Sequence, residues 1–214
     1  MADTPFKALL VEGTSGAGKS TLIDGLLRRH AAIAPPRKIR TLVHLAQSHT
    51  YGPLAAAEDR GTLTADENAR HIEGIVQVLE WLHACVQEHD RPWCFALIDT
   101  LHLTHCVRPG VVQWSDVERF DGRLAAIGCK LIFLEVSPLT LWERGIQPRM
   151  NNQFILQYSR KFGRNPEEIH RYFLKEQRVV ADLFARSSMS KLKIAHDCEP
   201  ETVLEAAYRF WIEG

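Results

Sequence analysis

The sequence lacks a long apolar run. No stretch of its 214 residues reaches the roughly 18 consecutive apolar residues that a membrane-spanning helix needs. The amino terminus also lacks the basic segment followed by an apolar segment that marks a signal peptide. We therefore expect a soluble, cytoplasmic protein with no membrane partner.

The sequence also lacks an excess of charge of one sign, and its cysteines are not spaced in pairs. The 26 Lys and Arg residues equal the 26 Asp and Glu residues, and this balance argues against a nucleic acid polymer as partner. It leaves room for a local basic pocket. An odd number of cysteines without CxxC pairs predicts reduced thiols in the cytoplasm, and these are Cys85, Cys94, Cys106, Cys129 and Cys198.

What the sequence does contain is a series of short apolar runs separated by segments with helical spacing. The runs cover residues 6–11, 39–45, 94–98, 131–136 and 192–195. Their nearly continuous apolar character predicts strands that are buried on both faces, as in a parallel sheet covered by helices. We expect residues 1–214 to form one α/β domain, a three-layer sandwich around a five-stranded parallel sheet.

Apolar stripes and end signals place the longer helices. A stripe with spacings of three and four predicts a helix over residues 66–88. An asparagine followed by proline and two glutamates predicts a helix start at 165 and a helix to about 185, and a last helix begins near 201. Trp81 and Trp142 fit helix stripes, so we expect both in the core.

A phosphate-binding loop stands between the first predicted strand and a helix. Eight residues fit G-x-x-x-x-G-K-[ST] at every defined position and Thr21 follows them: Gly13, Thr14, Ser15, Gly16, Ala17, Gly18, Lys19 and Ser20. Glycines let backbone N–H groups point at phosphates, and the helix start adds its positive dipole end. We expect Lys19 to reach the β- and γ-phosphates of ATP and the Ser20 hydroxyl to ligate Mg²⁺.

Phosphate binding alone does not separate a kinase from a GTPase or a motor ATPase. The guanine-reading N-K-x-D motif is absent, and Asp99 is not followed by the D-x-x-G arrangement of a GTPase switch. The chain also has no second large domain for hydrolysis to move. These absences favour an enzyme, an ATP-dependent small-molecule kinase.

The residues around this loop resemble a known family. The segment E-G-T-S-G-A-G-K-S-T, which begins at Glu12, is similar to the E-G-x-x-G-A-G-K-S-T of thymidylate kinases and deoxynucleoside kinases. The segment L-E-V-S-P-L-T-L-W-E-R, which ends at Arg144, resembles their L-x-V-x-P-x-x-x-x-x-R. The resemblance implies a P-loop nucleoside- or nucleotide-kinase-like fold with an arginine-bearing lid near residues 144–165. The ending from Lys193 through the last helix resembles the part of these kinases that lies against the adenine.

Two segments depart from the family pattern, and both fall on the acceptor side. The second predicted strand ends in L-A-Q-S-H at residues 45–49, where these kinases have Glu or Asp-Arg. Asp99 is followed by Thr100 and Leu101 instead of arginine. The donor is therefore better defined than the phosphoryl acceptor.

Two carboxylates are candidates for the chemistry. Asp99 ends the third apolar run, where it could hold Mg²⁺, accept the proton of an attacking hydroxyl or cap the next turn. Glu12 immediately precedes the loop, either as a second carboxylate near the metal or as a structural hydrogen-bonding acid.

Basic residues after the fourth strand are candidates for stabilising the transferred phosphoryl group. Arg144 and Arg149 come first, and Arg160, Lys161 and Arg164 follow in a polar segment. Cations that close over the equatorial oxygens suit phosphoryl transfer, whereas a solvated basic loop is the alternative.

Several side chains near the departing segments are candidates for the acceptor pocket: His49, Tyr51, His102, His105, Arg108 and Trp114. The His102–His105 spacing has no third metal ligand, so ordinary polar packing is the alternative reading. The leading hypothesis is transfer of the γ-phosphoryl group of ATP to a hydroxyl of a nucleoside or nucleoside-like compound. Alternatives are a nucleoside monophosphate kinase, an antibiotic- or metabolite-modifying kinase, and an ATP-binding regulatory module. The oligomeric state stays open, with a homodimer as one alternative.

Overall fold

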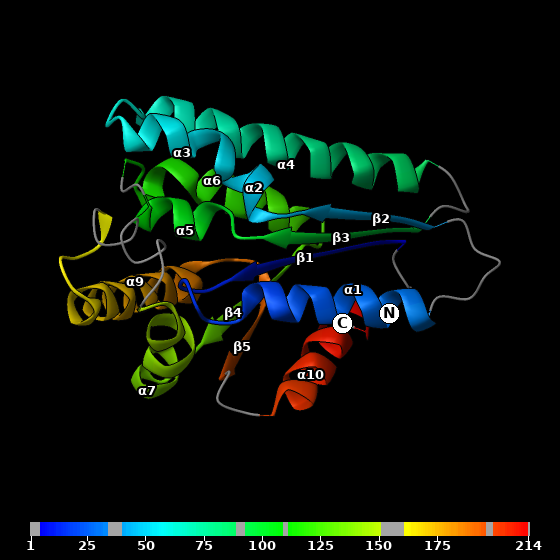
Figure 1. Cartoon of the computed structure of the whole chain (residues 1–214). Helices are drawn as coiled ribbons and strands as arrows, with labels where there is room; N and C mark the ends of the chain where they lie inside the picture. The colour runs from blue at the N-terminus through cyan, green and yellow to red at the C-terminus, as the bar shows by residue number, and fades with distance from the viewer. Residues whose placement is uncertain are drawn as a thin grey trace.

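A computed structural model of the chain describes residues 5–33, 40–88, 93–108, 111–150, 161–195 and 199–213. Its centre is a sheet of five parallel strands in the order β2-β3-β1-β4-β5 (Figure 1). The strands are β1 (Phe6–Glu12), β2 (Arg40–Leu45), β3 (Trp93–Asp99), β4 (Lys130–Glu135) and β5 (Ser190–Ala195). The predicted five-stranded parallel sheet is confirmed, with strand ends shifted by at most two residues.

The order of the strands creates a point where ligands bind in sheets of this kind. The chain passes from β1 over β3 to the edge strand β2, and it later returns from β3 over β1 to β4. The carboxyl ends of β1 and β3 are therefore neighbours at a topological switch point. Val11 pairs with Asp99 in this register, so Glu12 and Asp99 lie at the same edge.

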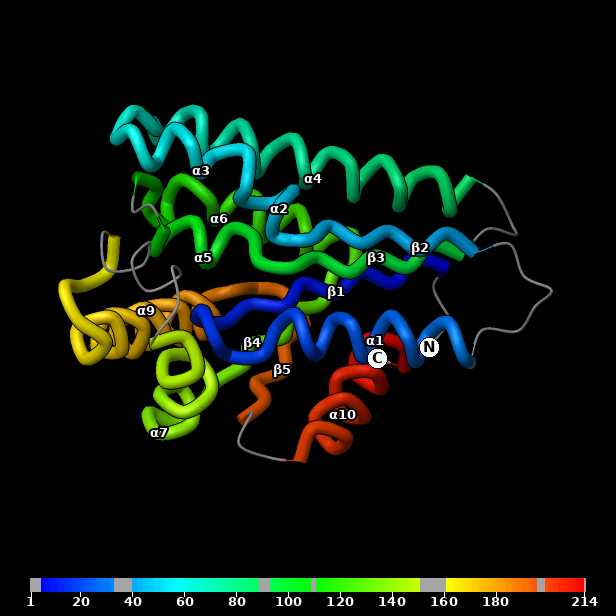
Figure 2. The backbone as a smooth tube through the Cα atoms, in the orientation of Figure 1, coloured from blue at the N-terminus to red at the C-terminus, as the bar shows by residue number. Residues whose placement is uncertain are grey.

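Long helices cover both faces of the sheet (Figures 1 and 2). One face carries α4 (Ala65–Gln87) and α6 (Trp114–Ala126), and the other carries α1 (Lys19–Ile33) and α10 (Pro200–Glu213), which contact each other. The helix α9 (Pro166–Arg186) contributes to the core on both sides. The predicted helix start is confirmed. The Asn165 side chain caps α9 by accepting a hydrogen bond from the Glu168 N–H at 2.8 Å.

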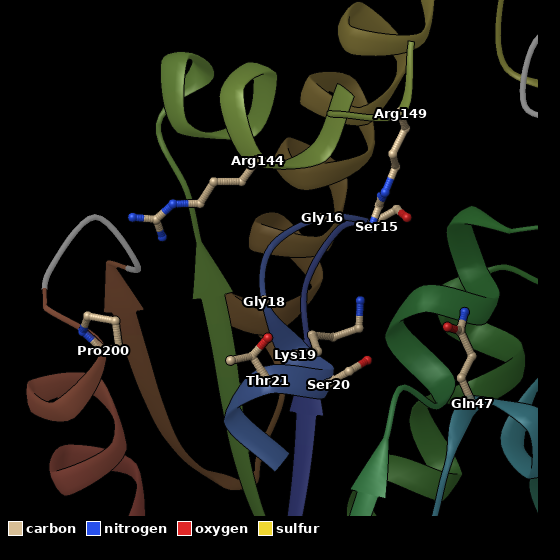
Figure 3. Close-up of a pocket in the computed structure, with 10 residues that line it drawn as sticks. All are labelled: Ser15, Gly16, Gly18, Lys19, Ser20, Thr21, Gln47, Arg144, Arg149 and Pro200. Atoms are coloured by element: carbon tan, nitrogen blue, oxygen red, sulfur yellow. The ribbon is translucent and has the colours of Figure 1, made fainter. Parts of the chain in front are cut away.

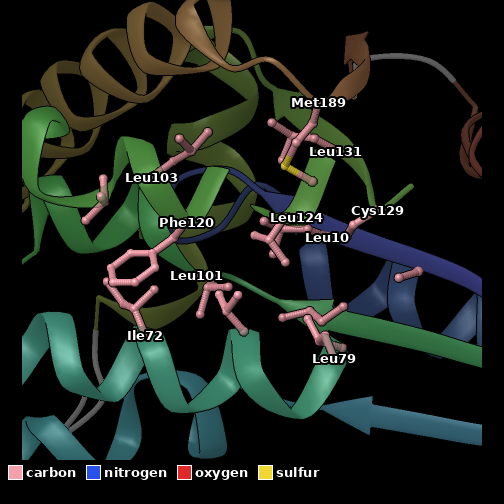
Figure 4. Packing of buried hydrophobic residues seen from close by; sticks show 14 of the residues in the cluster. Leu10, Ile72, Leu79, Leu101, Leu103, Phe120, Leu124, Cys129, Leu131 and Met189 are labelled. Atoms are coloured by element: carbon pink, nitrogen blue, oxygen red, sulfur yellow. The ribbon is translucent and has the colours of Figure 1, made fainter. Parts of the chain in front are cut away.

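The core between the sheet and α4 is apolar and close-packed. Figure 4 shows Phe120 of α6 and Ile72 of α4 pointing into it, together with Leu10 of β1. The expectation that Trp81 belongs to the core is wrong, because its side chain is 64% exposed on the outer face of α4. Trp142 is partly buried against the cluster on the α1 side, as expected.

Short helices stand at the carboxyl edge of the sheet, next to the candidate site. The sequence patterns above did not predict them: α2 (Gln47–Thr50), α3 (Gly52–Asp59), α5 (His102–Val107), α7 (Pro138–Thr140), η1 (Leu141–Ile146) and η2 (Gln147–Arg149). Within the described ranges, no helix combines the length and apolar character that crossing a bilayer requires. The four cysteines in these ranges are free thiols, whereas Cys198 lies outside them.

Candidate active site

The phosphate-binding loop has a backbone conformation that only glycine adopts readily. Gly13, Gly16 and Gly18 have φ angles of 152°, 84° and 89°. A Cβ atom at Gly13 would lie 2.9 Å from the Leu134 carbonyl oxygen, and one at Gly16 would lie 2.8 Å from the Gly145 Cα atom. Gly13 and Gly16 are therefore required both by the turn and by the close approach of neighbouring backbone, and Gly18 is required by the turn.

Lys19 stands at the start of α1 and folds back over the loop. Its Nζ atom donates hydrogen bonds to the carbonyl oxygens of Gly13 (2.7 Å) and Thr14 (3.1 Å). Burial lowers the pKa of Lys19, and the nearby Asp99 carboxylate opposes this decrease. The ammonium group is thus held within the loop that would surround the phosphates.

A cavity of about 480 Å³ opens above the loop (Figure 3). Figure 3 shows Arg149 pointing toward Ser15 and Gly16 of the loop, whereas Arg144 extends toward the side of Pro200, opposite Gln47. Its lining comes from the loop, α1, α2, the segment after β4 and α10: Ser15, Gly16, Gly18, Lys19, Ser20, Thr21, Gln47, Arg144, Arg149 and Pro200. The structure thus brings together the P-loop residues and the two arginines that the sequence singled out.

The segment that carries these arginines packs directly on the P-loop. Gly145 and Gly16 approach so closely that a Cβ atom at Gly145 would lie 3.5 Å from the Gly16 Cα atom. Arg149 donates a hydrogen bond to the Gly145 carbonyl oxygen at 3.2 Å. Residues 151–160, with Arg160, lie outside the described ranges, so only part of the predicted lid segment is visible.

Asp99 is buried at the carboxyl end of β3, with 6% of its surface exposed. One carboxylate oxygen accepts a hydrogen bond from the Thr100 hydroxyl at 3.0 Å, and the Thr50 hydroxyl donates to the Asp99 carbonyl oxygen at 2.8 Å. Thr100 has a φ angle of 66°, the only positive φ of a non-glycine residue in the described ranges. Strained backbone of this kind persists only where its surroundings enforce it, and it is concentrated at functional sites.

Glu12 is fully buried and faces the turn that follows Asp99. Its Oε1 atom accepts a hydrogen bond from the Leu101 N–H at 2.9 Å, and its Oε2 atom accepts one from the Thr104 hydroxyl at 2.6 Å. Both oxygens are therefore engaged with the start of α5. This arrangement holds the strained turn at Thr100 in place.

A second cavity, of about 250 Å³, adjoins the first at Gln47, which lines both. Its other lining residues come from α3, the end of α5 and the segment before α9: Tyr51, Glu58, Asp59, Arg108, Lys161 and Phe162. Lys161 forms ion pairs with Glu58 (3.3 Å) and with Asp59. Burial and the neighbouring Glu58 carboxylate raise the pKa of Tyr51.

Four of the residues predicted for the acceptor pocket lie elsewhere. His102 is fully buried, with Nε2 3.0 Å from Asp121 Oδ1, and its ring lies 6.3 Å from that of Trp114. His49 is exposed next to Ser48. His105 is also fully buried, with its Nδ1 atom facing Asn68 Oδ1. None of the four lines either cavity described above, whereas Tyr51 and Arg108 line the second one.

Most of the second cavity was not predicted from the sequence. Gln47 was visible only as a departure from the kinase pattern, and Glu58, Asp59 and Phe162 carried no motif at all. Their common signal is position, because the segments that follow β2 and β4 must lie at the edge where the P-loop ends.

Comparison with known proteins establishes the fold. No protein-family model matches the chain, and no curated protein matches its sequence. The YorR protein of Bacillus subtilis, solved in complex with phosphorylated GDP, superposes with a TM-score of 0.58 and 9% identity, over 94% of this chain and 92% of that one. A gluconokinase from Sinorhizobium meliloti 1021 superposes with a TM-score of 0.55 and 13% identity, over 98% and 93%. The chain therefore has the predicted kinase-like P-loop NTPase fold.

Proposed function

We propose that this protein is an ATP-dependent phosphotransferase that moves the γ-phosphoryl group to a hydroxyl of a small molecule. The observation that supports this most strongly is the pair of adjoining cavities. One is built on the P-loop and capped by two arginines, and the other shares Gln47 with it and holds polar, charged and aromatic side chains. A nucleotide sensor needs the first cavity but has no use for the second.

The donor cavity holds ATP through its phosphates. The loop N–H groups and Lys19 bind the β- and γ-phosphates, and Arg144 and Arg149 reach the cavity from the opposite side. Negative charge spreads over the equatorial oxygens in the transition state, so preorganised cations on both sides lower its free energy. The contact between Gly16 and Gly145 fixes the distance between the two sides.

Mg²⁺ would be held by oxygen ligands at the base of this cavity. The Ser20 hydroxyl lines the cavity, and the Asp99 carboxylate acts electrostatically on the adjacent Lys19. A hydroxyl and a carboxylate are oxygen donors of the type that Mg²⁺ prefers. When bound, the ion would supply positive charge that neutralises the negative charge developing on the transferred phosphoryl group.

Asp99 suits the role of general base better than Glu12. Both Glu12 oxygens already accept hydrogen bonds at the start of α5, whereas Asp99 accepts one from its neighbour Thr100. In the proposed reaction, Asp99 accepts the proton of the acceptor hydroxyl. The hydroxyl oxygen then bonds to the γ-phosphorus while the bond to the β–γ bridging oxygen breaks, so ADP and a phosphate monoester are released.

The acceptor cavity fits a compact hydroxylated compound, and we favour a nucleoside or nucleoside-like molecule. Tyr51 and Phe162 offer aromatic surface for a ring, and Gln47, Glu58 and Asp59 offer hydrogen-bond partners for hydroxyl groups. One structural neighbour is named as a gluconokinase and the other binds phosphorylated GDP, and both names fit phosphoryl chemistry on small molecules. A nucleoside monophosphate acceptor, or an antibiotic or other metabolite, stays as the alternative acceptor.

The cellular setting is proposed on the same grounds. The free thiols of Cys85, Cys94, Cys106 and Cys129 suit the reducing cytoplasm. A balanced charge argues against a nucleic acid polymer as partner. The proposed partners are therefore a nucleotide and a small acceptor molecule.

The proposal is tested by measuring ADP release from ATP and Mg²⁺ with a panel of acceptors. The panel contains nucleosides, nucleoside monophosphates, gluconate and hydroxylated antibiotics. We expect at least one uncharged hydroxyl compound to stimulate ADP release. A slow rate that no acceptor changes would instead identify an ATP-binding regulatory module.

A further inference from the structure

A single buried carboxylate joins the P-loop to the acceptor cavity. Glu176 of α9 is 2% exposed. Its Oε1 atom accepts hydrogen bonds from the Thr14 hydroxyl (2.8 Å) and from Arg108 Nη2 (2.7 Å), and its Oε2 atom accepts one from Arg108 Nε (2.7 Å). Thr14 belongs to the phosphate-binding loop and Arg108 lines the second cavity. One side chain therefore contacts both halves of the site.

Arg108 is held in place by Glu176 and by two aromatic rings. Its guanidinium group lies 5.6 Å from the ring centre of Phe162 and 5.5 Å from that of Phe173, and its bond to Glu176 is a two-point fork. Its charge also contributes to lowering the pKa of Lys19. Arg108 thus lines the second cavity and is close enough to the P-loop for its charge to act on Lys19.

The helix that carries Glu176 is anchored at the same point. The neighbouring residue Gln177 accepts a hydrogen bond from the Val136 N–H at 3.0 Å and donates one to the Val136 carbonyl oxygen at 2.9 Å. Val136 directly follows β4, where the arginine-bearing segment begins. Glu176 is therefore held at a defined position relative to the sheet, and a shift of the P-loop must change its bond with Thr14.

A buried ion pair does not need to serve stability. Moving a glutamate and an arginine out of water costs several kcal/mol per ion, and apolar residues of similar size often stabilise a core equally well. The shared Oε1 atom connects this pair to a loop that binds nucleotide, and the arginine borders a cavity. Both features are explained by a role in the site.

We propose that Glu176 is a positioning residue that couples the P-loop to Arg108. It holds the guanidinium in the wall of the second cavity, and the Thr14 bond links that placement to the conformation of the loop. Arg108 is then in place for the phosphoryl group once the loop holds nucleotide. This inference rests on the proposed function only in the role that it gives to Arg108.

Hydrogen exchange measured with and without ADP and Mg²⁺ tests the coupling without any acceptor. In the wild-type protein, nucleotide should slow amide exchange in residues 13–20 and also in residues 102–108 and 161–176, each by about threefold or more. In Thr14→Val, which removes only the hydroxyl donor, the slowing at 13–20 should persist and that at the two distant segments should fall by at least about half. Thr14→Ser keeps the hydroxyl and should behave as wild type.

Glu176→Gln provides the second variant, because it leaves the P-loop unchanged while breaking the fork to Arg108. In this variant, nucleotide should no longer slow amide exchange in residues 102–108 and 161–176 but should still slow it in residues 13–20. If Thr14→Val does not bind ADP, Glu176→Gln takes its place in the comparison with the wild type. The coupling is overturned if ADP and Mg²⁺ slow amide exchange in residues 102–108 and 161–176 equally in the wild type, Thr14→Val and Glu176→Gln. It is also overturned if Thr14→Ser, which keeps the hydroxyl, loses this slowing. Wild-type protein that shows the coupling but no acceptor-stimulated turnover would contradict the proposed function alone.

Discussion

At the scale of single residues, the two buried carboxylates near the P-loop differ in what their oxygens contact. Glu12 accepts hydrogen bonds from Leu101 and Thr104, which hold the start of α5, whereas Asp99 stands next to the strained residue Thr100. We propose on this ground that Glu12 supports the fold locally and that Asp99 serves the chemistry. Their substitutions should have opposite effects on stability and rate.

Asp99→Asn should lower kcat by about 100-fold or more, because the amide can neither accept the hydroxyl proton nor carry charge to the metal. Its melting temperature should change little. Glu12→Gln should instead lower the free energy of unfolding by about 1–3 kcal/mol, since one buried hydrogen bond loses its acceptor. Initial rates and urea unfolding of both variants check the assignment. A larger loss of kcat in folded Glu12→Gln than in Asp99→Asn would reverse the two roles.

The buried side chain of His105 should make the stability of the protein depend on pH. It is fully buried, and burial, with a contribution from nearby His71, lowers its pKa from 6.5 to about 3. The unfolded chain binds a proton in this interval and the folded chain does not. Stability from this residue is therefore complete above about pH 6.5 and decreases as the pH falls toward 3.

The measurement is urea unfolding from about pH 7.5 down to pH 4, compared between the wild type and His105→Gln. The variant has no group that titrates at this position, so its stability should decrease less steeply with falling pH. Parallel pH profiles for the two proteins would show that His105 does not contribute. His30 has a pKa lowered by burial as well and provides a second position to compare.

At the scale of elements, the P-loop and η1 meet through two glycines. Gly16→Ala should weaken binding of ADP and Mg²⁺ by about tenfold or more, because its positive φ is strained for alanine and the new Cβ would meet the Gly145 Cα atom at 2.8 Å. Gly145→Ala should have a smaller effect, since the nearest atom is the flexible Leu141 Cδ1 at 3.2 Å. Calorimetric titration with ADP checks both.

Gly74 is the matched control for these substitutions. It lies inside α4, and a Cβ atom there would meet nothing within 4 Å. Gly74→Ala should leave ADP affinity unchanged and stabilise the protein by roughly 0.5–1 kcal/mol, because alanine favours the helix. Gly16→Ala with the affinity of Gly74→Ala would contradict the role of the glycine contact.

The strands and the long helices could be predicted from the sequence, whereas the short helices could not. Five apolar runs gave the strands, and the Asn165 cap gave the start of α9. The helices α2, α3 and α5 have four, eight and six residues, too few for a periodic pattern to emerge. Trp81 was misassigned because a tryptophan one position off the buried stripe still resembles an apolar repeat.

At the scale of the whole molecule, the proposed donor half of the site is local in sequence and the proposed acceptor half is not. Eight consecutive residues build the P-loop, so a motif was enough to find it. The second cavity combines residues from α2, α3, α5 and the segment before α9, which only the strand order brings together. His102 and Trp114 illustrate the difference, because they follow β3 as expected but pack toward Asp121 and the core.

The central claim is that the terminal phosphoryl group of ATP reaches an organic hydroxyl. The most direct measurement follows the ³²P label of γ-labelled ATP in the presence of the nucleoside and metabolite panel, and compares the wild type with Lys19→Ala. We predict that the label appears in a new phosphate monoester with one of the uncharged compounds, and that Lys19→Ala reduces this transfer by at least about 100-fold. Label that appears only as inorganic phosphate, at a rate that no compound changes, would contradict the account.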